Sequence, residues 1–217
     1  MSRVPPMRLL RAVITDQQTA TVLRLVLEPQ TAAHALALFP VLCDPAIYRH
    51  ENQPPASASG LLQRFEALEA RGSPDGREQW LNWVVRTDPQ PGAADDLQPQ
   101  SVAPSWTGYV QATLDGSGDA LLGYEFASDW WGRGIARAAV AAMLDELAAS
   151  YGSRRAVAVT KRSNRRSQAL LQRLDFNVVA QWPAIAGPPV ADECCWTLTR
   201  SATPEPGRGS AAPARRS

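Results

Sequence analysis

The chain has 217 residues, 45% of them hydrophobic and seven of them tryptophan, with a formal net charge of +1 at pH 7. That length and apolar content suffice for one packed domain with tails. A charge so close to zero provides no strong field for nucleic acid or an anionic membrane, so we expect neither as a partner. The sequence has no apolar run of about eighteen residues and no segment of the secretion-signal type, so we expect a cytoplasmic protein.

Cysteine and histidine usage argues against several kinds of active site. Cys43 stands alone and Cys194 and Cys195 are adjacent, a spacing that fits no metal site and disfavours a disulfide between the neighbours. We therefore expect three free thiols and no bound metal. The two histidines, His34 and His50, both fall in the N-terminal part and form no triad or zinc spacing, so a covalent hydrolase is not expected.

The first half of the chain alternates between strand and helix patterns. Residues 1–18 carry a short apolar patch at 9–14, which suits either an N-terminal arm or an extra edge strand. Alternating apolar residues indicate strands, and apolar residues three and four apart indicate helices. The expected elements are a strand at 22–28, a helix from a Thr31 cap through Cys43, a helix at 61–69, and antiparallel strands at 80–86 and 105–114.

Two segments have the composition of unstructured chain. Residues 88–104 hold four prolines and few core-forming side chains. We expect a flexible hairpin insertion there, a solvated loop in preference to the alternative of a substrate lid. Residues 201–217 are mostly Pro, Gly, Ala, Ser and Arg, with nothing to bury, so we expect a disordered tail.

The second half is organised around a strand, a turn and a helix. A strand at 121–127 contains Glu125 between two aromatic residues. Gly132 and Gly134 then open a helix at 135–151 whose apolar side chains recur every four residues. The remaining expected elements are a strand at 155–160, parallel to 121–127 because of the crossover, a helix opened by Ser163 or Asn164, and a closing hairpin of 178–180 and 194–198.

The two glycines before this helix create a candidate anion site. Free N–H groups at a helix N-terminus carry about half a positive charge, and glycine lets phosphate oxygens approach the backbone. The amides from Gly132 to Ala136 can therefore face one pyrophosphate. A glycine pair that serves only as a turn is the alternative, and the motif alone does not separate the two.

In this order, the elements resemble the GNAT superfamily of N-acetyltransferases and, within it, the RimJ/RimL-like branch of ribosomal-protein alanine acetyltransferases. The resemblance covers about residues 19–200, which we take as the domain, and rests on residues 122–125, 130–136 and 164–176. In the family's pyrophosphate motif, Gln/Arg-x-x-Gly-x-Gly/Ala, Gly134 and Ala136 match the last two defined places.

Two positions depart from the family pattern. Trp131 replaces the first residue of the pyrophosphate motif, which is a feature of this branch. Asp175 stands where the family has a glycine whose left-handed conformation ends the helix. Aspartate tolerates that conformation less well, so either the turn is adjusted or Asp175 is mildly strained.

The resemblance implies an α/β (α+β) GNAT fold, with a mixed twisted sheet of about six to seven strands, flanked by about four helices and splayed between its fourth and fifth strands. Acetyl-CoA, the co-substrate, would lie in the gap, with its pantetheine arm on strand backbone and its pyrophosphate on the helix N-terminus. The implied cofactor-binding residues are Phe126, Ser128, Trp131, Gly132, Arg133, Gly134, Ile135, Ala136, Asn164 and Ser167.

Attack of an amine on a thioester requires a base for the ammonium proton and a donor for the leaving thiolate. Glu125 is the candidate base, being a lone carboxylate in an aromatic strand, although strand alternation can instead direct it into a salt bridge. Ser167 is the candidate donor, because Leu171 occupies the place where many relatives have a tyrosine. The local alternative is that Ser163 or Asn164 merely caps the helix and Ser167 faces inward.

The sequence thus predicts an acetyl-CoA-dependent N-acetyltransferase that acts on a primary amine by direct attack. Peptide N-termini, small amines and antibiotics all fit as acceptors, and we expect a monomer or homodimer. The alternative is a non-catalytic acyl-CoA-binding module that keeps the loop and has lost the base. Glu125 distinguishes the two hypotheses.

Overall fold

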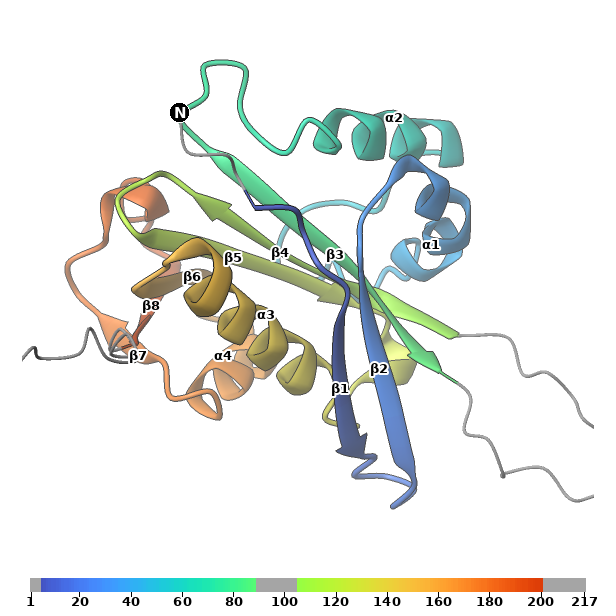
Figure 1. The fold of residues 1–217 in the computed structure, drawn as a ribbon. Coiled ribbons are helices and arrows are strands. Elements are labelled where there is room, and N and C mark those ends of the chain that lie inside the picture. The colour runs from blue at the N-terminus through green and yellow to red at the C-terminus, as the bar shows by residue number, and fades with distance from the viewer. Residues whose placement is uncertain (1–4, 89–104, 201–217) are drawn as a thin grey trace, which may run out of the picture.

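One mixed β-sheet forms the centre of the molecule, for which a computed structural model describes residues 5–88 and 105–200 (Figure 1). The strand order is β1-β2-β3-β4-β5-β6-β8-β7, and every neighbouring pair is antiparallel except β5 with β6. The strands are β1 (Leu10–Thr15), β2 (Val22–Pro29), β3 (Gln79–Asp88), β4 (Ser105–Leu114), β5 (Asp119–Phe126), β6 (Arg155–Lys161), β7 (Asn177–Val179) and β8 (Glu193–Thr199).

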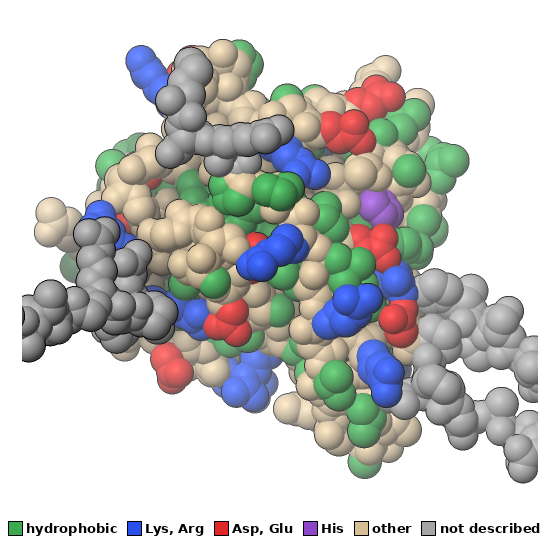
Figure 2. Space-filling view, in the orientation of Figure 1, with side chains coloured by type: hydrophobic (Ala, Val, Ile, Leu, Met, Phe, Trp, Pro, Cys, Tyr) green, Lys and Arg blue, Asp and Glu red, His purple; other side chains and the backbone are tan. Residues whose placement is uncertain are grey.

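Helices cover both faces of the sheet. A large apolar cluster joins α3 to β-strand side chains such as Leu27, Trp83 and Val110, and a smaller one joins α1 and α2 to Val84 and Tyr109 on the opposite face. The helices are α1 (Ala35–Leu42), α2 (Ala58–Leu68), α3 (Ile135–Tyr151) and α4 (Arg165–Gln172). Figure 2 shows basic and acidic side chains interspersed over one face, as a net charge near zero leads one to expect.

The two parallel strands pair only at one end. Their register comprises Asp119 with Arg155, Ala120 with Ala156, and Leu121 with Val157, whereas β4 stays paired with β5 as far as Phe126. Beyond Leu121 the edge of β5 that faces β6 has no strand partner. The sheet is therefore splayed between β5 and β6. These are the predicted fourth and fifth strands, at 121–127 and 155–160, whose numbers rise by one because β1 is an additional strand.

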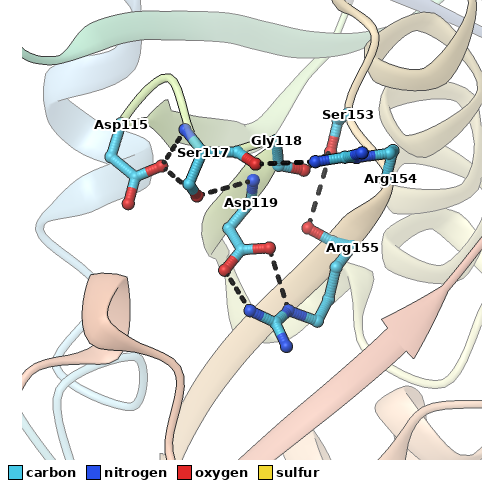
Figure 3. A network of polar contacts seen from close by, with 7 residues as sticks. All are labelled: Asp115, Ser117, Gly118, Asp119, Ser153, Arg154 and Arg155. Carbon is cyan, nitrogen blue, oxygen red and sulfur yellow. Dashed lines mark hydrogen bonds and ion pairs between the residues drawn. The ribbon is translucent and has the colours of Figure 1, made fainter.

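A polar network holds the closed end of this splay together (Figure 3). Arg155 Nε donates to Asp119 Oδ1 at 2.9 Å, and a second guanidinium nitrogen contacts the other carboxylate oxygen. Arg154 Nη2 donates to the Ser117 carbonyl oxygen at 3.1 Å. Because these contacts tie the turn before β5 to the start of β6, the two strands are joined at this end and separate toward Phe126.

Most sequence predictions for the fold are confirmed, with one difference in strand number. The described residues contain eight strands, one more than the upper estimate, because the patch at 9–14 forms edge strand β1. Thr31 caps the first helical turn in a reciprocal arrangement with His34. Asp175 keeps the left-handed conformation, at φ 63°, so the turn after α4 is not adjusted.

The structure bears on three further sequence predictions. All three cysteines are free. Within residues 5–88 and 105–200, no helix has the length and apolar character needed to cross a membrane. The predicted hairpin insertion, apart from Asp88 at the end of β3, and the predicted tail at 201–217 lie outside the described residues.

Candidate active site

A cavity of about 710 Å³ opens where β5 and β6 diverge. Its walls come from the end of β5, the loop and first turn of α3, the start of α4 and the segment 46–52. Two of the predicted site residues, Ser128 and Arg133, are not in its wall. The predicted site residues that line it are Glu125, Phe126, Trp131, Gly132, Gly134, Ile135, Ala136, Asn164 and Ser167.

The cavity reaches both faces of the sheet. Tyr109, in its wall, belongs to the apolar cluster beneath α1 and α2, whereas Ile135 belongs to the cluster beneath α3 on the other face. Since both side chains line one cavity, the cavity passes through the gap between β5 and β6.

The N-terminus of α3 is free of internal caps. Gly134 is its N-cap residue, with φ 88°, no side chain to cap the helix and no acidic residue in the first turn. Gly132 is also left-handed, at φ 76°. Both conformations favour glycine, and they leave the first amides of α3 available to an anion.

Arginine side chains add positive charge to this part of the cavity, whose wall includes Arg137, Arg165, Arg166 and Arg173. The Arg166 guanidinium stacks 3.6 Å from the centre of the Trp131 ring, which gives that tryptophan a structural reason to replace a polar residue. Arg133 lies over Trp130 at 4.8 Å and points toward Asp16. The helix amides and the arginines together suit a phosphorylated ligand.

The two backbone positions predicted to hold the pantetheine arm have partners within the chain. The Phe126 carbonyl accepts a hydrogen bond from Trp131 Nε1 at 2.8 Å. The Ser128 N–H donates to Asp44 Oδ2 at 2.6 Å. Burial disfavours the charged carboxyl of Asp44, but hydrogen bonds from Ser128 and Ala46, together with the charge of Arg49, outweigh burial and hold its pKa below the ordinary value. A cofactor role for these two groups stays a prediction.

Glu125 lies in the cavity wall beside tyrosine hydroxyl groups. Tyr48 is 3.1 Å from Glu125 Oε2 and also 2.9 Å from the Leu42 carbonyl oxygen, which its hydroxyl can donate to instead. Burial raises the pKa of Glu125, against the opposing effect of hydrogen bonds from Tyr48 and Tyr109. No ion pair in the described part of the chain includes Glu125, so it is not directed into a salt bridge.

Ser167 and Asn164 meet at the start of α4. Asn164 Oδ1 accepts a hydrogen bond from the Ser167 N–H at 3.1 Å, so Asn164 is the helix cap. The Ser167 hydroxyl is 2.6 Å from the Tyr124 hydroxyl, and both residues line the cavity. Burial raises the pKa of Tyr124 to about 12, so its phenol stays protonated at neutral pH. The cap therefore leaves the Ser167 hydroxyl at the cavity wall.

Sequence reasoning missed the tyrosines that surround the two candidate catalytic groups. Tyr109 pairs with Glu125 across β4 and β5. Strand alternation alone does not predict this contact, because it does not give the register of the two strands. Tyr124 was identified as a strand residue without its contact to Ser167. Tyr48 lies in the irregular segment after α1, where no periodic pattern indicates a direction.

A sheet that splays beside a glycine-bounded helix N-terminus is the architecture of the acyl-CoA-dependent N-acyltransferases. A family model described as acetyltransferase (GNAT) domain matches residues 24–177, so this chain belongs to the GNAT acetyltransferase family. It is therefore an acyltransferase, and acetyl-CoA is the co-substrate of the family. Comparison with curated proteins gives no significant match.

Three solved structures illustrate the relationship. RimL, a ribosomal L7/L12 alpha-N-protein acetyltransferase in complex with coenzyme A, has 16% identity and a TM-score of 0.63, covering 88% of this chain and 100% of its own. RimJ from Mycobacterium smegmatis, in complex with CoA-disulfide, has 18% identity and a TM-score of 0.63, covering 88% and 85%. The ribosomal-protein-S5-alanine acetyltransferase from Vibrio fischeri has 17% identity and a TM-score of 0.59, covering 81% and 92%. At identities this low, the TM-scores show a shared fold and nothing further.

Proposed function

We propose that the protein transfers an acetyl group from acetyl-CoA to a primary amine by direct attack, with no acyl-enzyme intermediate. The observation that carries the proposal is the cavity through the splay, which joins a basic, uncapped helix N-terminus to the carboxylate of Glu125. The basic part suits the phosphates of the cofactor, and the acidic group suits an ammonium ion.

The residues present fit acetyl-CoA. The amides from Gly132 to Ala136 hold the pyrophosphate, assisted by Arg165 and Arg166, which line the same cavity. The capping bond of Asn164 uses its side-chain oxygen, so its amide nitrogen would be the group that contacts the pantetheine arm. The cofactor supplies the activated thioester, and the chain supplies position and a protected environment.

Glu125 takes the proton from the acceptor's ammonium group. Its raised pKa brings it closer to the pKa of an amine, which improves a general base at neutral pH. Tyr48 suits both charge states of this carboxyl. The Tyr48 hydroxyl donates to the ionised carboxylate. When Glu125 gains a proton, Tyr48 can donate to the Leu42 carbonyl oxygen instead, and the protonated Glu125 then donates to the Tyr48 hydroxyl oxygen.

The Ser167 hydroxyl donates a hydrogen bond to the sulfur of the leaving thiolate. The tyrosine that many relatives place on this helix is absent, since Leu171 is fully buried in the core and carries no hydroxyl. Tyr124 takes over part of the function of that missing tyrosine by holding the Ser167 hydroxyl at the cavity wall. A thiolate is a good leaving group, so a hydrogen bond to the sulfur is sufficient help.

Among acceptor classes we place protein or peptide N-termini first, because RimL and the Vibrio fischeri enzyme are described as acting on ribosomal proteins. Small amines are the second class. The remaining expectations, a cytoplasmic monomer or homodimer with no nucleic-acid or membrane partner, belong to this proposal. A non-catalytic acyl-CoA-binding module is the alternative, and the position of Glu125 in the cavity favours the enzyme.

The test is a mass-spectrometric screen for acetyl transfer to N-terminal peptides, polyamines and amine antibiotics, run beside calorimetric binding of coenzyme A. We expect binding of coenzyme A and acetylation of at least one amine class. Binding without transfer to any acceptor would support the non-catalytic module instead. The absence of binding would remove the proposed cofactor site.

A further inference from the structure

The turn between β1 and β2 lies against the candidate phosphate loop. Within this turn the Asp16 N–H donates to the Thr21 carbonyl oxygen at 2.7 Å, and Asp16 Oδ1 accepts from the Gln18 N–H at 2.8 Å. The Asp16 residue is 1% exposed. These internal hydrogen bonds give the turn a defined shape, although its two glutamine side chains lie at the surface.

Two side chains of the turn contact the phosphate loop directly. Gln18 Nε2 donates to the Trp131 carbonyl oxygen at 3.0 Å. Asp16 Oδ2 is 3.7 Å from Arg133 Nη1, and hydrogen bonds from the Gln18 N–H, together with the charge of Arg133, hold the pKa of Asp16 below its ordinary value. Asp16 is thus ionised at neutral pH and paired with an arginine of the loop.

The bond to Trp131 fixes the orientation of the next amide. In a trans peptide the carbonyl oxygen and the following N–H point in opposite directions. Since the Trp131 oxygen is directed to Gln18, the Gly132 N–H of the same peptide is directed away from the turn. Gly132 also lines the cavity, so this amide is available to a ligand bound there.

Gln17 is placed to reach the ligand itself. It lines the cavity together with Gly134, and a Cβ atom built on Gly134 would lie 3.9 Å from Gln17 Nε2. A side-chain amide at this distance from the helix N-terminus can add a neutral N–H donor for a phosphate oxygen. The turn precedes residues 24–177, the part that the family model matches.

We propose that the β1–β2 turn is a wall of the acetyl-CoA phosphate site. Gln17 donates to the bound phosphates, and Gln18 and Asp16 are positioning residues that hold the loop amides toward them. The proposal rests on the proposed function, because it concerns the same cofactor site.

Calorimetry with coenzyme A tests the turn, with Gln63→Ala as the matched control because Gln63 is exposed on α2 outside the cavity wall. We expect Gln17→Ala and Gln18→Ala each to weaken binding about tenfold, the equivalent of one lost hydrogen bond to a charged group. Gln17→Glu should weaken binding further, because it places a like charge beside the phosphates. Gln63→Ala should bind as the wild type does.

Kinetics separate this role from a general structural one. The KM for acetyl-CoA should rise in both alanine variants while kcat at saturation stays within about twofold of wild type. Acetylpantetheine lacks the phosphates, so its kcat/KM should be the same for the wild type and both alanine variants. Unchanged coenzyme A affinity in both variants, or an equal loss with acetylpantetheine, would overturn the role of the turn. Wild-type protein that fails to bind coenzyme A would instead overturn the proposed function.

Discussion

The hydroxyl oxygens of Tyr124 and Ser167 lie 2.6 Å apart, one on β5 and the other on α4, on the two sides of the splay. In the proposed mechanism the two residues act as one unit, because the Tyr124 phenol orients the Ser167 hydroxyl at the cavity wall. Residues that act as a unit lose their effect together, and their substitutions are not additive.

Tyr124→Phe and Ser167→Ala should therefore each lower kcat by less than about tenfold, since a thiolate needs little acid assistance. The double variant should be no slower than the slower single variant. Steady-state kinetics with saturating acetyl-CoA give the three values. Additive losses would show that the two hydroxyls act independently.

Glu125→Gln should stabilise the protein near neutral pH. Burial raises the pKa of Glu125 in the folded protein, above about 4.3 in the unfolded chain, so the folded state binds this proton more tightly. Above the pKa of Glu125 in the folded protein, its ionised carboxylate lowers the free energy of unfolding. This loss disappears as the pH falls toward about 4.3. Melting temperatures should show a gain for the variant at about pH 7.5 that vanishes near about pH 4. A gain that grows on acidification would contradict the assigned sign.

Gly134→Val should severely weaken binding of coenzyme A. Valine is disfavoured at φ 88°, and its side chain would displace the amides at the start of α3. Gly76→Val is the matched control, because Gly76 has φ 70° with no atom within 4 Å of its Cβ position and does not line the cavity. Calorimetry should find near-wild-type affinity for the control. Equal affinity in both variants would remove this loop from the cofactor site.

Asp119→Asn should destabilise the closed end of the splay. Asp119 is 8% exposed and loses its charge-assisted bonds to Arg155, which we expect to cost about 1–3 kcal/mol in the free energy of unfolding. Asp145→Asn removes a surface pair with Arg200 and should cost less than about 1 kcal/mol. Urea denaturation measures both. A similar small loss at the two positions would show that Asp119 does not hold the strands together.

The sequence predicted those parts of the fold that local patterns encode. Strand alternation, the glycines before α3 and the Thr31 cap act over a few residues, and each indicates its own element. The edge strand β1 was ambiguous because a short apolar patch becomes a strand only when a neighbour such as β2 pairs with it. Register and sheet order depend on contacts between distant residues, which no local pattern contains.

The same distinction explains the candidate site. Gly132, Gly134, Asn164 and Ser167 belong to short motifs, and the structure brings all four to one cavity. The partners that tune the chemistry come from elsewhere in the chain, as Tyr48 does for Glu125 across 77 residues. The β1–β2 turn is still more distant in sequence from the loop that it contacts, since Gln18 donates to a carbonyl oxygen 113 residues away.

The pH dependence of acetyl transfer by Glu125→Gln, with the best acceptor from the screen, tests the central claim most directly. Glu51→Gln, which removes another carboxylate from the cavity wall, controls for loss of negative charge. We predict that kcat of Glu125→Gln falls about ten- to a thousandfold while the affinity for acetyl-CoA is retained. For a peptide acceptor, whose α-amino group has a pKa of about 8, the loss should be greater at about pH 6 than at about pH 9, where most of that amine is already neutral. Wild-type kcat in Glu125→Gln across this pH range would contradict the assignment of Glu125 as the base.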